Sequence, residues 1–223
     1  MKRLIWNSII LLFIFLTAPA EGFGIETYDY LERIDTLSVK IFWQLEEKKD
    51  NIILTSIRAG EIHIYQCDLL GATLQWELKN PGTNTDIVAR REKRSILING
   101  TFEGESIDKK VSIDGAPWYQ PMSFSLTSFI KSDKSSVEFW SLRPNDLLSY
   151  KMKAKKKEIQ LIKIHGKEVE VQKVKVSLTG FRSMFWHGYY WFRKVDGLFM
   201  KYEGVNGPPG TPKTIIELIR EGN

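Results

Sequence analysis

Alternating apolar and polar side chains dominate most of the chain. Segment 36–47, TLSVKIFWQLEE, is rich in β-branched and aromatic residues, and turn residues separate it from similar segments at 50–60 and 61–68. The loop PGTN divides segment 73–80 from segment 85–92. The pattern therefore predicts a succession of β-strands, which continues at 95–100, 109–115, 136–144 and 146–154.

One segment, PMSFSLTSFIKS at 121–132, departs from this alternation. Its apolar residues follow helical spacing, so that Met122, Leu126, Phe129 and Ile130 share one face. Because the chain contains no internal repeat and no linker, we predict one mainly β domain. Its expected architecture is a single antiparallel, strongly curved sheet, or half-barrel, closed by one short helix near 121–132.

Segment 158–178 predicts a hairpin that turns at His165-Gly166. A two-residue loop pairs Ile164 with Lys167, Lys163 with Glu168 and Ile162 with Val169, which places an opposite-charge pair on one face. The lysine cluster before it, KAKKKE at 153–158, has two interpretations. It is either a solvated turn or a lysine-protected edge strand, or it faces an anionic partner.

Segment 185–204, FWHGYYWFRKVDGLFMKYEG, contains eight aromatic residues. Asp196-Gly197 is a preferred pair for a type I′ hairpin turn, and a turn there pairs Trp191 with Tyr202. Side-chain alternation then puts Tyr190 on the opposite face. Both faces remain largely aromatic, so we expect both to be covered. The helix covers one face, and the chain ends, a partner or a ligand cover the other.

The C-terminal stretch has a different character. Glycine and proline residues between 204 and 212 predict a rigid, non-helical path. The apolar TIIELI at 214–219 fits either a last strand or a helical turn.

The N-terminus has the pattern of a secretory signal peptide. Lys2 and Arg3 precede an apolar run, and Ala18 and Ala20 occupy the small-residue positions of a cleavage site. We therefore predict a signal peptide at 1–20 and a single periplasmic β domain at 21–223. The apolar run is shorter than the ~20 residues of a membrane span, so we expect no integral membrane protein after cleavage.

Composition and charge narrow the function classes. The chain has 43% hydrophobic and 26% charged residues, and loss of residues 1–20 lowers the formal charge from +5 to +3. This mild charge argues against a nucleic-acid partner. The single cysteine, Cys67, excludes an internal disulfide and is interpreted as a small buried hydrophobe.

Common catalytic and metal-binding motifs are absent from the sequence: there is no G-x-S-x-G, H-E-x-x-H, C-x-x-C or Gly-rich phosphate loop. We expect no cofactor and no metal. His187 is interpreted as a packed core residue beside aromatics. The alternative is a hydrolase in which His187 acts as a base with Asp196 or Glu203, although the hairpin turn already accounts for Asp196.

Several stretches resemble a known group of proteins. They are APWYQPMSFSLTSFI, VEFWSLRPND, GKEVEVQKVKVSL, the aromatic segment 185–204 and GPPGTPKTIIEL. They resemble uncharacterised secreted proteins of Gram-negative, delta-proteobacterial type. These group with a periplasmic domain-of-unknown-function family whose sheets are similar to those of the lipoprotein carriers LolA and LolB. The resemblance implies an antiparallel half-barrel with an apolar concave face, which holds acyl chains in the carriers.

These observations predict a non-enzymatic periplasmic protein that binds a hydrophobic or amphipathic, lipid-like ligand on an aromatic concave face. The alternative is a structural or assembly factor that binds another cell-envelope protein. The candidate ligand-binding residues are Trp118, Phe124, Phe129, Trp140, Trp186, Tyr190 and Trp191.

Overall fold

The computed structural model describes residues 24–164, 166–180, 186–205 and 211–222. The predicted signal peptide at 1–20 and the turn residue His165 lie outside these ranges. The strands are β1 (Ile25–Ile34), β2 (Leu37–Glu47), β3 (Ile52–Arg58), β4 (Glu61–Cys67), β5 (Thr73–Asn80), β6 (Thr85–Glu92), β7 (Ser95–Phe102), β8 (Glu105–Ser112), β9 (Ser136–Leu142), β10 (Ser149–Ile164), β11 (Lys167–Leu178), β12 (His187–Arg193), β13 (Phe199–Val205) and β14 (Lys213–Gly222). The helices are η1 (Pro81–Thr83), α1 (Met122–Ser125) and α2 (Thr127–Lys131).

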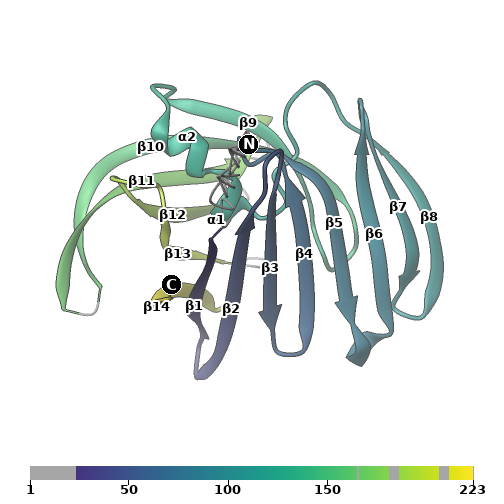
Figure 1. Ribbon diagram of the computed structural model, residues 1–223, viewed down its shortest axis with the longest axis horizontal. Helices are drawn as coiled ribbons and strands as arrows, with labels where there is room; N and C mark the ends of the chain where they lie inside the picture. The colour runs from purple at the N-terminus through teal and green to yellow at the C-terminus, as the bar shows by residue number, and fades with distance from the viewer. Residues whose placement is uncertain (1–23, 165, 181–185, 206–210, 223) are drawn as a thin grey trace, which may run out of the picture.

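All fourteen strands belong to one antiparallel sheet with the order β8-β7-β6-β5-β4-β3-β2-β1-β14-β13-β12-β11-β10-β9. The sheet is not closed, because β8 and β9 are the two ends of this order. Figure 1 shows β1 to β8 as one array of strands and β9 to β14 curving away from it, with α1 and α2 inside the curve. The predicted fold class is therefore confirmed.

The first and last strands join the two parts of the sheet. β1 pairs with β14 from Thr27 opposite Gly222 to Ile34 opposite Thr214. The sequence patterns did not predict the strand at 25–34, and they left 214–219 open between a strand and a helical turn. The pairing settles 214–219 as part of a strand, because its backbone groups bond to both β1 and β13.

The chain crosses from one end of the sheet to the other through the segment before α1. The backbone N–H of Trp140 donates to Pro117 O at 2.8 Å, and the N–H of Tyr119 donates to Trp140 O at 2.8 Å. On its other side, the segment accepts a hydrogen bond at 2.7 Å from the Thr73 N–H to Trp118 O. The crossover thus supplies partners to β9 and to the start of β5, which satisfies backbone groups that would otherwise be buried and unpaired.

Two apolar clusters form the core. One lies between β9–β13, the helices and the inner residues of β1 and β2. The other lies under β5–β8 and is completed by Trp118, Leu142 and Leu147. Cys67 is fully buried, and burial raises the pKa of its thiol to about 12, as expected for a residue that acts as a small hydrophobe.

The helical segment is present but is divided at Leu126 into α1 and α2. Leu126, Phe129 and Ile130 are buried in the core, as their spacing predicted. Lys156 of β10 points inward and donates to the carbonyl oxygens of Ile130 and Ser132. Because these carbonyls lie at the end of α2, the ammonium supplies the partners that a helix C-terminus lacks.

The β10–β11 hairpin has the predicted register, with Ile164 opposite Lys167, Lys163 opposite Glu168 and Ile162 opposite Val169. The register of the aromatic hairpin differs from the prediction. Tyr202 lies opposite Tyr190, and Trp191 lies opposite Lys201. The turn spans more residues than a type I′ turn and a β-bulge follows it, so the predicted pairing of Trp191 with Tyr202 was wrong by one residue.

The two faces of β12 are covered in different ways. Tyr190 faces the concave side, and Trp191 points to the opposite face. There, the ammonium groups of Lys173 and Lys201 lie 5.5 and 5.6 Å from the Trp191 ring centroid. The long lysine side chains therefore cover the aromatic surface on this face while their charged ends stay near water.

Tyr202 is fitted to two facing glycines. Gly188 lies opposite Gly204, and the Tyr202 ring packs where their side chains would be. A Cβ atom at Gly204 would approach Tyr202 Oη to 2.1 Å, whereas a Cβ at Gly24 would have no neighbour within 4 Å. We expect Gly204→Ala to lower the free energy of unfolding by about 1–3 kcal/mol through overpacking. Urea unfolding measures this loss. Gly24→Ala serves as the control, and an equal effect of the two substitutions would contradict the packing assigned to Tyr202.

Candidate functional site

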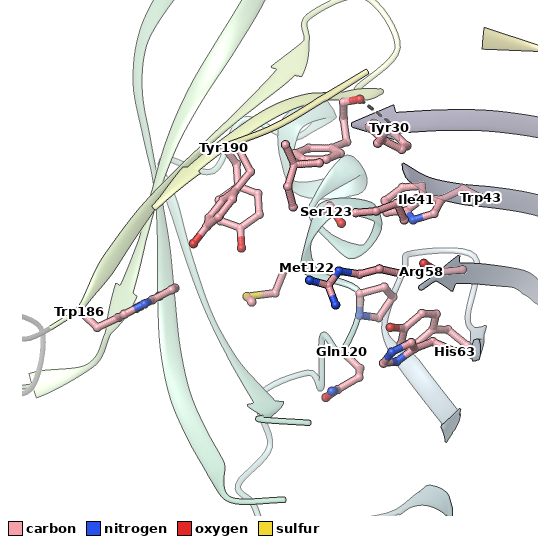
Figure 2. Close-up of a pocket in the computed structure, with 16 residues that line it drawn as sticks. Tyr30, Ile41, Trp43, Arg58, His63, Gln120, Met122, Ser123, Trp186 and Tyr190 are labelled. Atoms are coloured by element: carbon pink, nitrogen blue, oxygen red, sulfur yellow. Dashed lines mark hydrogen bonds between the residues drawn. The ribbon is translucent and has the colours of Figure 1, made fainter. Parts of the chain in front are cut away.

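A pocket of about 310 Å³ lies on the concave side, where the two parts of the sheet face each other. Figure 2 shows its walls: β1–β4 on one side, the aromatic strands on the other, and the start of α1 between them. Most of the lining is aromatic or aliphatic. The lining residues are Tyr30, Ile41, Trp43, Ser56, Arg58, His63, Tyr65, Gln120, Pro121, Met122, Ser123, Trp186, Tyr190, Phe199, Tyr202 and Ile216.

Aromatic contacts connect the two walls. The ring of Tyr30 lies 4.8 Å from Trp43 and 5.3 Å from Phe199 between centroids. The Tyr30 hydroxyl also donates to Phe199 O at 3.1 Å, which links β1 to β13. Tyr190 packs against Tyr202 at 4.8 Å. These rings form a continuous apolar wall, held in place by packing in the core.

One corner of the pocket is polar and centres on Arg58. Its Nε donates to Glu32 Oε2 at 2.5 Å, and Nη1 lies 4.0 Å from Glu61 Oε2. Glu32 is only 5% exposed and does not line the pocket. Figure 2 shows the Arg58 side chain extending into the pocket toward Met122. The pocket therefore contains guanidinium N–H donors whose positive charge two carboxylates offset.

His63 adds a second ordered polar group. Trp76 Nε1 donates to His63 Nδ1 at 3.2 Å, and His63 Nε2 lies 3.5 Å from Glu61 Oε2. The imidazole also stacks on Tyr65 and Trp76. The hydrogen bond from His63 is the largest contribution that lowers the pKa of Glu61, so this carboxyl stays ionised. Within the described residues, no group of three or more His, Cys, Asp and Glu side chains has a metal-binding arrangement.

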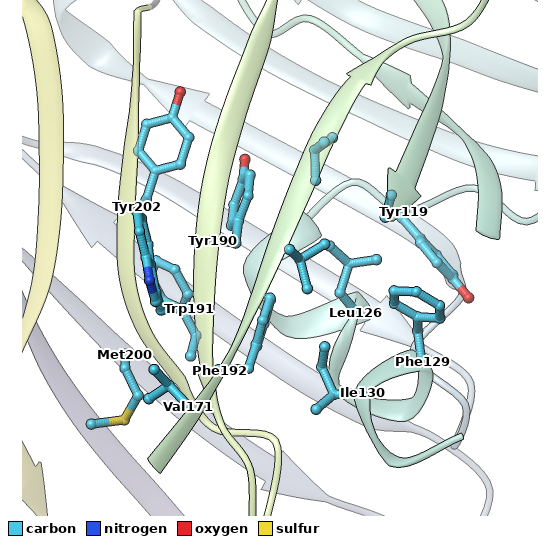
Figure 3. Close-up of a cluster of buried hydrophobic side chains, with 14 of the residues drawn as sticks. Tyr119, Leu126, Phe129, Ile130, Val171, Tyr190, Trp191, Phe192, Met200 and Tyr202 are labelled. Atoms are coloured by element: carbon cyan, nitrogen blue, oxygen red, sulfur yellow. The ribbon is translucent and has the colours of Figure 1, made fainter. Parts of the chain in front are cut away.

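Two of the seven predicted ligand-binding residues, Trp186 and Tyr190, line the pocket. Trp186 Nε1 donates to Val205 O at 2.8 Å, which fixes the indole at the pocket margin. Trp118 and Phe129 are buried in the core, and Figure 3 shows Phe129 packed beside Leu126 and Ile130. The structure thus brings Trp186 and Tyr190 together and separates them from the other candidates.

The remaining three candidates lie elsewhere. Trp140 is half-buried against the second core cluster, and its indole donates to Asp114 at 2.8 Å. Trp191 occupies the face opposite the pocket and donates to Gln160 at 2.8 Å. Phe124 of α1 is half-buried and does not line the pocket.

The β1–β4 wall of the pocket was not anticipated from the sequence. It contributes Tyr30, Ile41, Trp43 and the Arg58 corner. The alternation of segment 36–47 gave one indication of this wall. Ile41 and Trp43 are two residues apart, so they lie on the same face of a strand. Nothing in the local pattern indicated that this face would lie against β12–β14.

The structure does not assemble His187 with the carboxylates considered for a hydrolase. Asp196 is bound by Arg193, and Glu203 is bound by Lys201 and Lys213. The interpretation of His187 as a packed core residue was wrong, because it lies at the exposed start of β12. Its pKa is lowered by partial desolvation and by the nearby charge of Lys175. By strand alternation His187 also shares the face of Trp191, away from the pocket.

Comparisons with known proteins bear on the fold. No family model matches the chain, and no curated protein matches its sequence. A β-barrel-like protein of the domain-of-unknown-function family DUF1849 from Brucella abortus has a TM-score of 0.61 at 7% identity. The alignment covers 88% of this chain and 96% of that one. This similarity shows a shared fold.

Two further solved structures align over similar lengths. The hypothetical lipoprotein YmcC from Escherichia coli has a TM-score of 0.41 at 11% identity, covering 87% of this chain and 86% of that one. A LolA superfamily protein from Nitrosomonas europaea has a TM-score of 0.27 at 7% identity, covering 88% and 84%. Of these structures, the DUF1849 protein supports the predicted resemblance to a domain of unknown function at the level of the fold.

Trp191→Ala tests whether the Trp191 side chain stabilises the fold. Trp191 is 7% exposed and packs in the core. We expect the substitution to lower the free energy of unfolding by about 3–5 kcal/mol, because it removes a large buried side chain. Trp140→Ala, at a half-buried site, should cost less in the same urea titration. A loss below ~1 kcal/mol for Trp191→Ala would contradict burial of this face.

Proposed function

We propose that the protein binds a hydrophobic or amphipathic, lipid-like ligand in the concave pocket and that it does so without catalysing a reaction. The observation that carries the proposal is the pocket itself: an aromatic-lined space of about 310 Å³ between the two parts of the sheet. Binding sites for apolar small molecules are concave, mostly apolar and supplied with a few oriented polar groups. The fold alone does not establish this function, because one fold supports many functions.

The polar corner supports an amphipathic ligand over a purely apolar one. Arg58 and His63 place oriented polar atoms at one side of an otherwise apolar lining. A ligand with a polar end at this corner would accept hydrogen bonds from the Arg58 N–H groups that Glu32 does not engage, whereas a hydrocarbon would leave those groups unpaired at a cost of about 1–3 kcal/mol each. Its apolar part would then lie against Tyr30, Phe199 and Tyr190.

We also propose that residues 1–20 are a signal peptide and that residues 21–223 act as one domain in the periplasm. The support is the charged, apolar and small-residue pattern of the N-terminus. In the described ranges, none of the helices has the length and hydrophobicity needed to cross a bilayer. N-terminal sequencing of the exported protein should find Glu21 first, and a mature chain that begins at Met1 would contradict cleavage.

Native mass spectrometry of protein purified from the periplasm tests the ligand directly. A co-purifying mass that extraction identifies as a lipid supports the proposal. An apo mass with a stable second protein supports the alternative role in envelope assembly. Turnover in a screen of ester, peptide and glycoside substrates would contradict a purely binding role.

Filling the pocket provides a matched test. Ser56 lines the pocket from β3, whereas Thr55, the preceding residue of the same strand, points to the other face. We expect Ser56→Phe to reduce binding of a fluorescent acyl-chain probe by about tenfold or more, because the ring occupies ligand volume. Thr55→Phe should bind the probe like the wild type.

Both variants should first be checked by circular dichroism and urea unfolding. If Ser56→Phe does not fold, Met122→Trp offers a second way to fill the pocket, because Met122 lines it from α1. Unchanged probe binding by a folded pocket-filling variant would overturn the assignment of the ligand to this pocket.

A further inference from the structure

The sheet face opposite the pocket carries charges in two different arrangements. Over β13 and β14, basic and acidic side chains alternate. Lys201 contacts Glu203 at 2.9 Å and Glu217 at 3.2 Å, and Lys213 contacts Glu203 at 2.5 Å. Arg33 of β1 continues the series with an ion pair to Glu217. Each of these three basic side chains therefore has an acidic partner within the fold.

Over β10 and β11 the same face lacks such compensation. Lys155 lies directly opposite Lys175 in the strand register. Like charges in directly opposed positions of an antiparallel pair are destabilising. Neither lysine has an ion-pair partner among the residues that the structure describes.

The lysines next to Lys155 and Lys175 have few acidic side chains as ion-pair partners. Lys151 and Lys153 both approach Glu138, at 3.5 and 3.6 Å, and Lys173 approaches Glu158 at 3.2 Å. Lys151 also contacts Asp114 at 2.5 Å. We define the basic face as Lys151, Lys153, Lys155, Lys173 and Lys175. Its five ammonium groups exceed the three nearby carboxylates, and the excess is centred on Lys155 and Lys175.

The two structural roles considered for the lysine cluster at 153–158 do not account for this excess. The cluster does not form a turn, because it lies within β10. Lys155 is also not on an open edge, because it pairs with Ser136 of β9 on one side and with Lys175 of β11 on the other. Edge protection by lysine thus does not explain why two lysines face each other in the sheet interior.

Aromatic groups border the basic face. Lys175 lies opposite Tyr189, and Ser177 lies opposite His187, which is exposed. The ammonium of Lys173 lies 4.7 Å from the Tyr189 ring centroid. A surface that combines several lysines with amphipathic rings matches the phosphate and interfacial layers of a bilayer.

We propose that the basic face docks the protein onto a membrane surface containing anionic phospholipid. Lipid phosphates would supply the negative charge that no described acidic side chain provides between Lys155 and Lys175. The docking is independent of ligand binding, because the pocket opens on the opposite face of the sheet. Failure of one proposal therefore leaves the other standing.

Vesicle flotation tests the docking. The full mature chain is mixed with vesicles of phosphatidylcholine alone or with vesicles that also contain phosphatidylglycerol. We expect binding only to the anionic vesicles, weakening as salt rises and screens the charges. Equal binding to both vesicle types, or no binding to either, would overturn the proposal. Binding to soluble polyglutamate but not to vesicles would point to an acidic protein and would also overturn it.

A matched pair of double variants assigns the effect to this face. Lys155→Gln with Lys175→Gln should weaken binding to the anionic vesicles by about 30-fold, on the scale expected for two lysines near a charged membrane. Lys48→Gln with Lys49→Gln removes the same charge from the exposed turn after β2 and should leave binding nearly unchanged. If both double variants lost the same vesicle affinity, net charge alone would explain the binding. That result would contradict docking through the basic face.

Urea unfolding provides a readout that does not depend on vesicles. Because Lys155 and Lys175 repel each other across the strands, replacing both should keep or raise the unfolding midpoint. Probe binding in the pocket should also be unchanged. A lowered midpoint would show that the two lysines stabilise the fold, and would contradict their assignment to an external partner.

Discussion

The pairing of β1 with β14 is the constraint on which the rest of the structure depends. The two strands bring together residues almost two hundred positions apart, such as Thr27 and Gly222. Without this pairing, β1–β8 and β9–β14 would be two separate sheets with open edges at β1 and β14. Closing so long a loop costs conformational entropy, and only the contacts that follow the pairing offset it.

Those contacts are concentrated where the two parts of the sheet face each other. The Tyr30 hydroxyl bonds to the backbone of Phe199, and its ring packs against Trp43. The same residues line the pocket, so the interaction that stabilises the arrangement also shapes the candidate binding site. Glu32 and Glu61 then hold Arg58 in that apolar space with its charge offset, which suits a site that hydrogen-bonds a ligand without attracting a counterion.

The sheet face opposite the pocket, or outer face, is covered differently from the pocket face. Its residue Trp191 is buried, and lysine side chains from both neighbouring strands lie against its ring. Over β13 and β14, each basic side chain of the series has an acidic partner on the same face. Over β10 and β11, Lys155 lies opposite Lys175 and this part of the face keeps a positive charge. The two faces of one sheet thus differ in apolar character and charge.

Local pattern by itself determined most of the strands, the helical segment near 121–132 and the register of the β10–β11 hairpin, because side-chain alternation and short turns act over a few residues. It did not determine β1, whose partner lies at the far end of the chain, or the register after Trp191, where a bulge shifts the pairing by one residue. Aromatic residues in the sequence pointed to Trp186 and Tyr190 but equally to Trp118 and Phe129, which are core. Whether an aromatic residue fills a core or lines a pocket depends on what the distant strands place opposite it, and only the tertiary structure decided that.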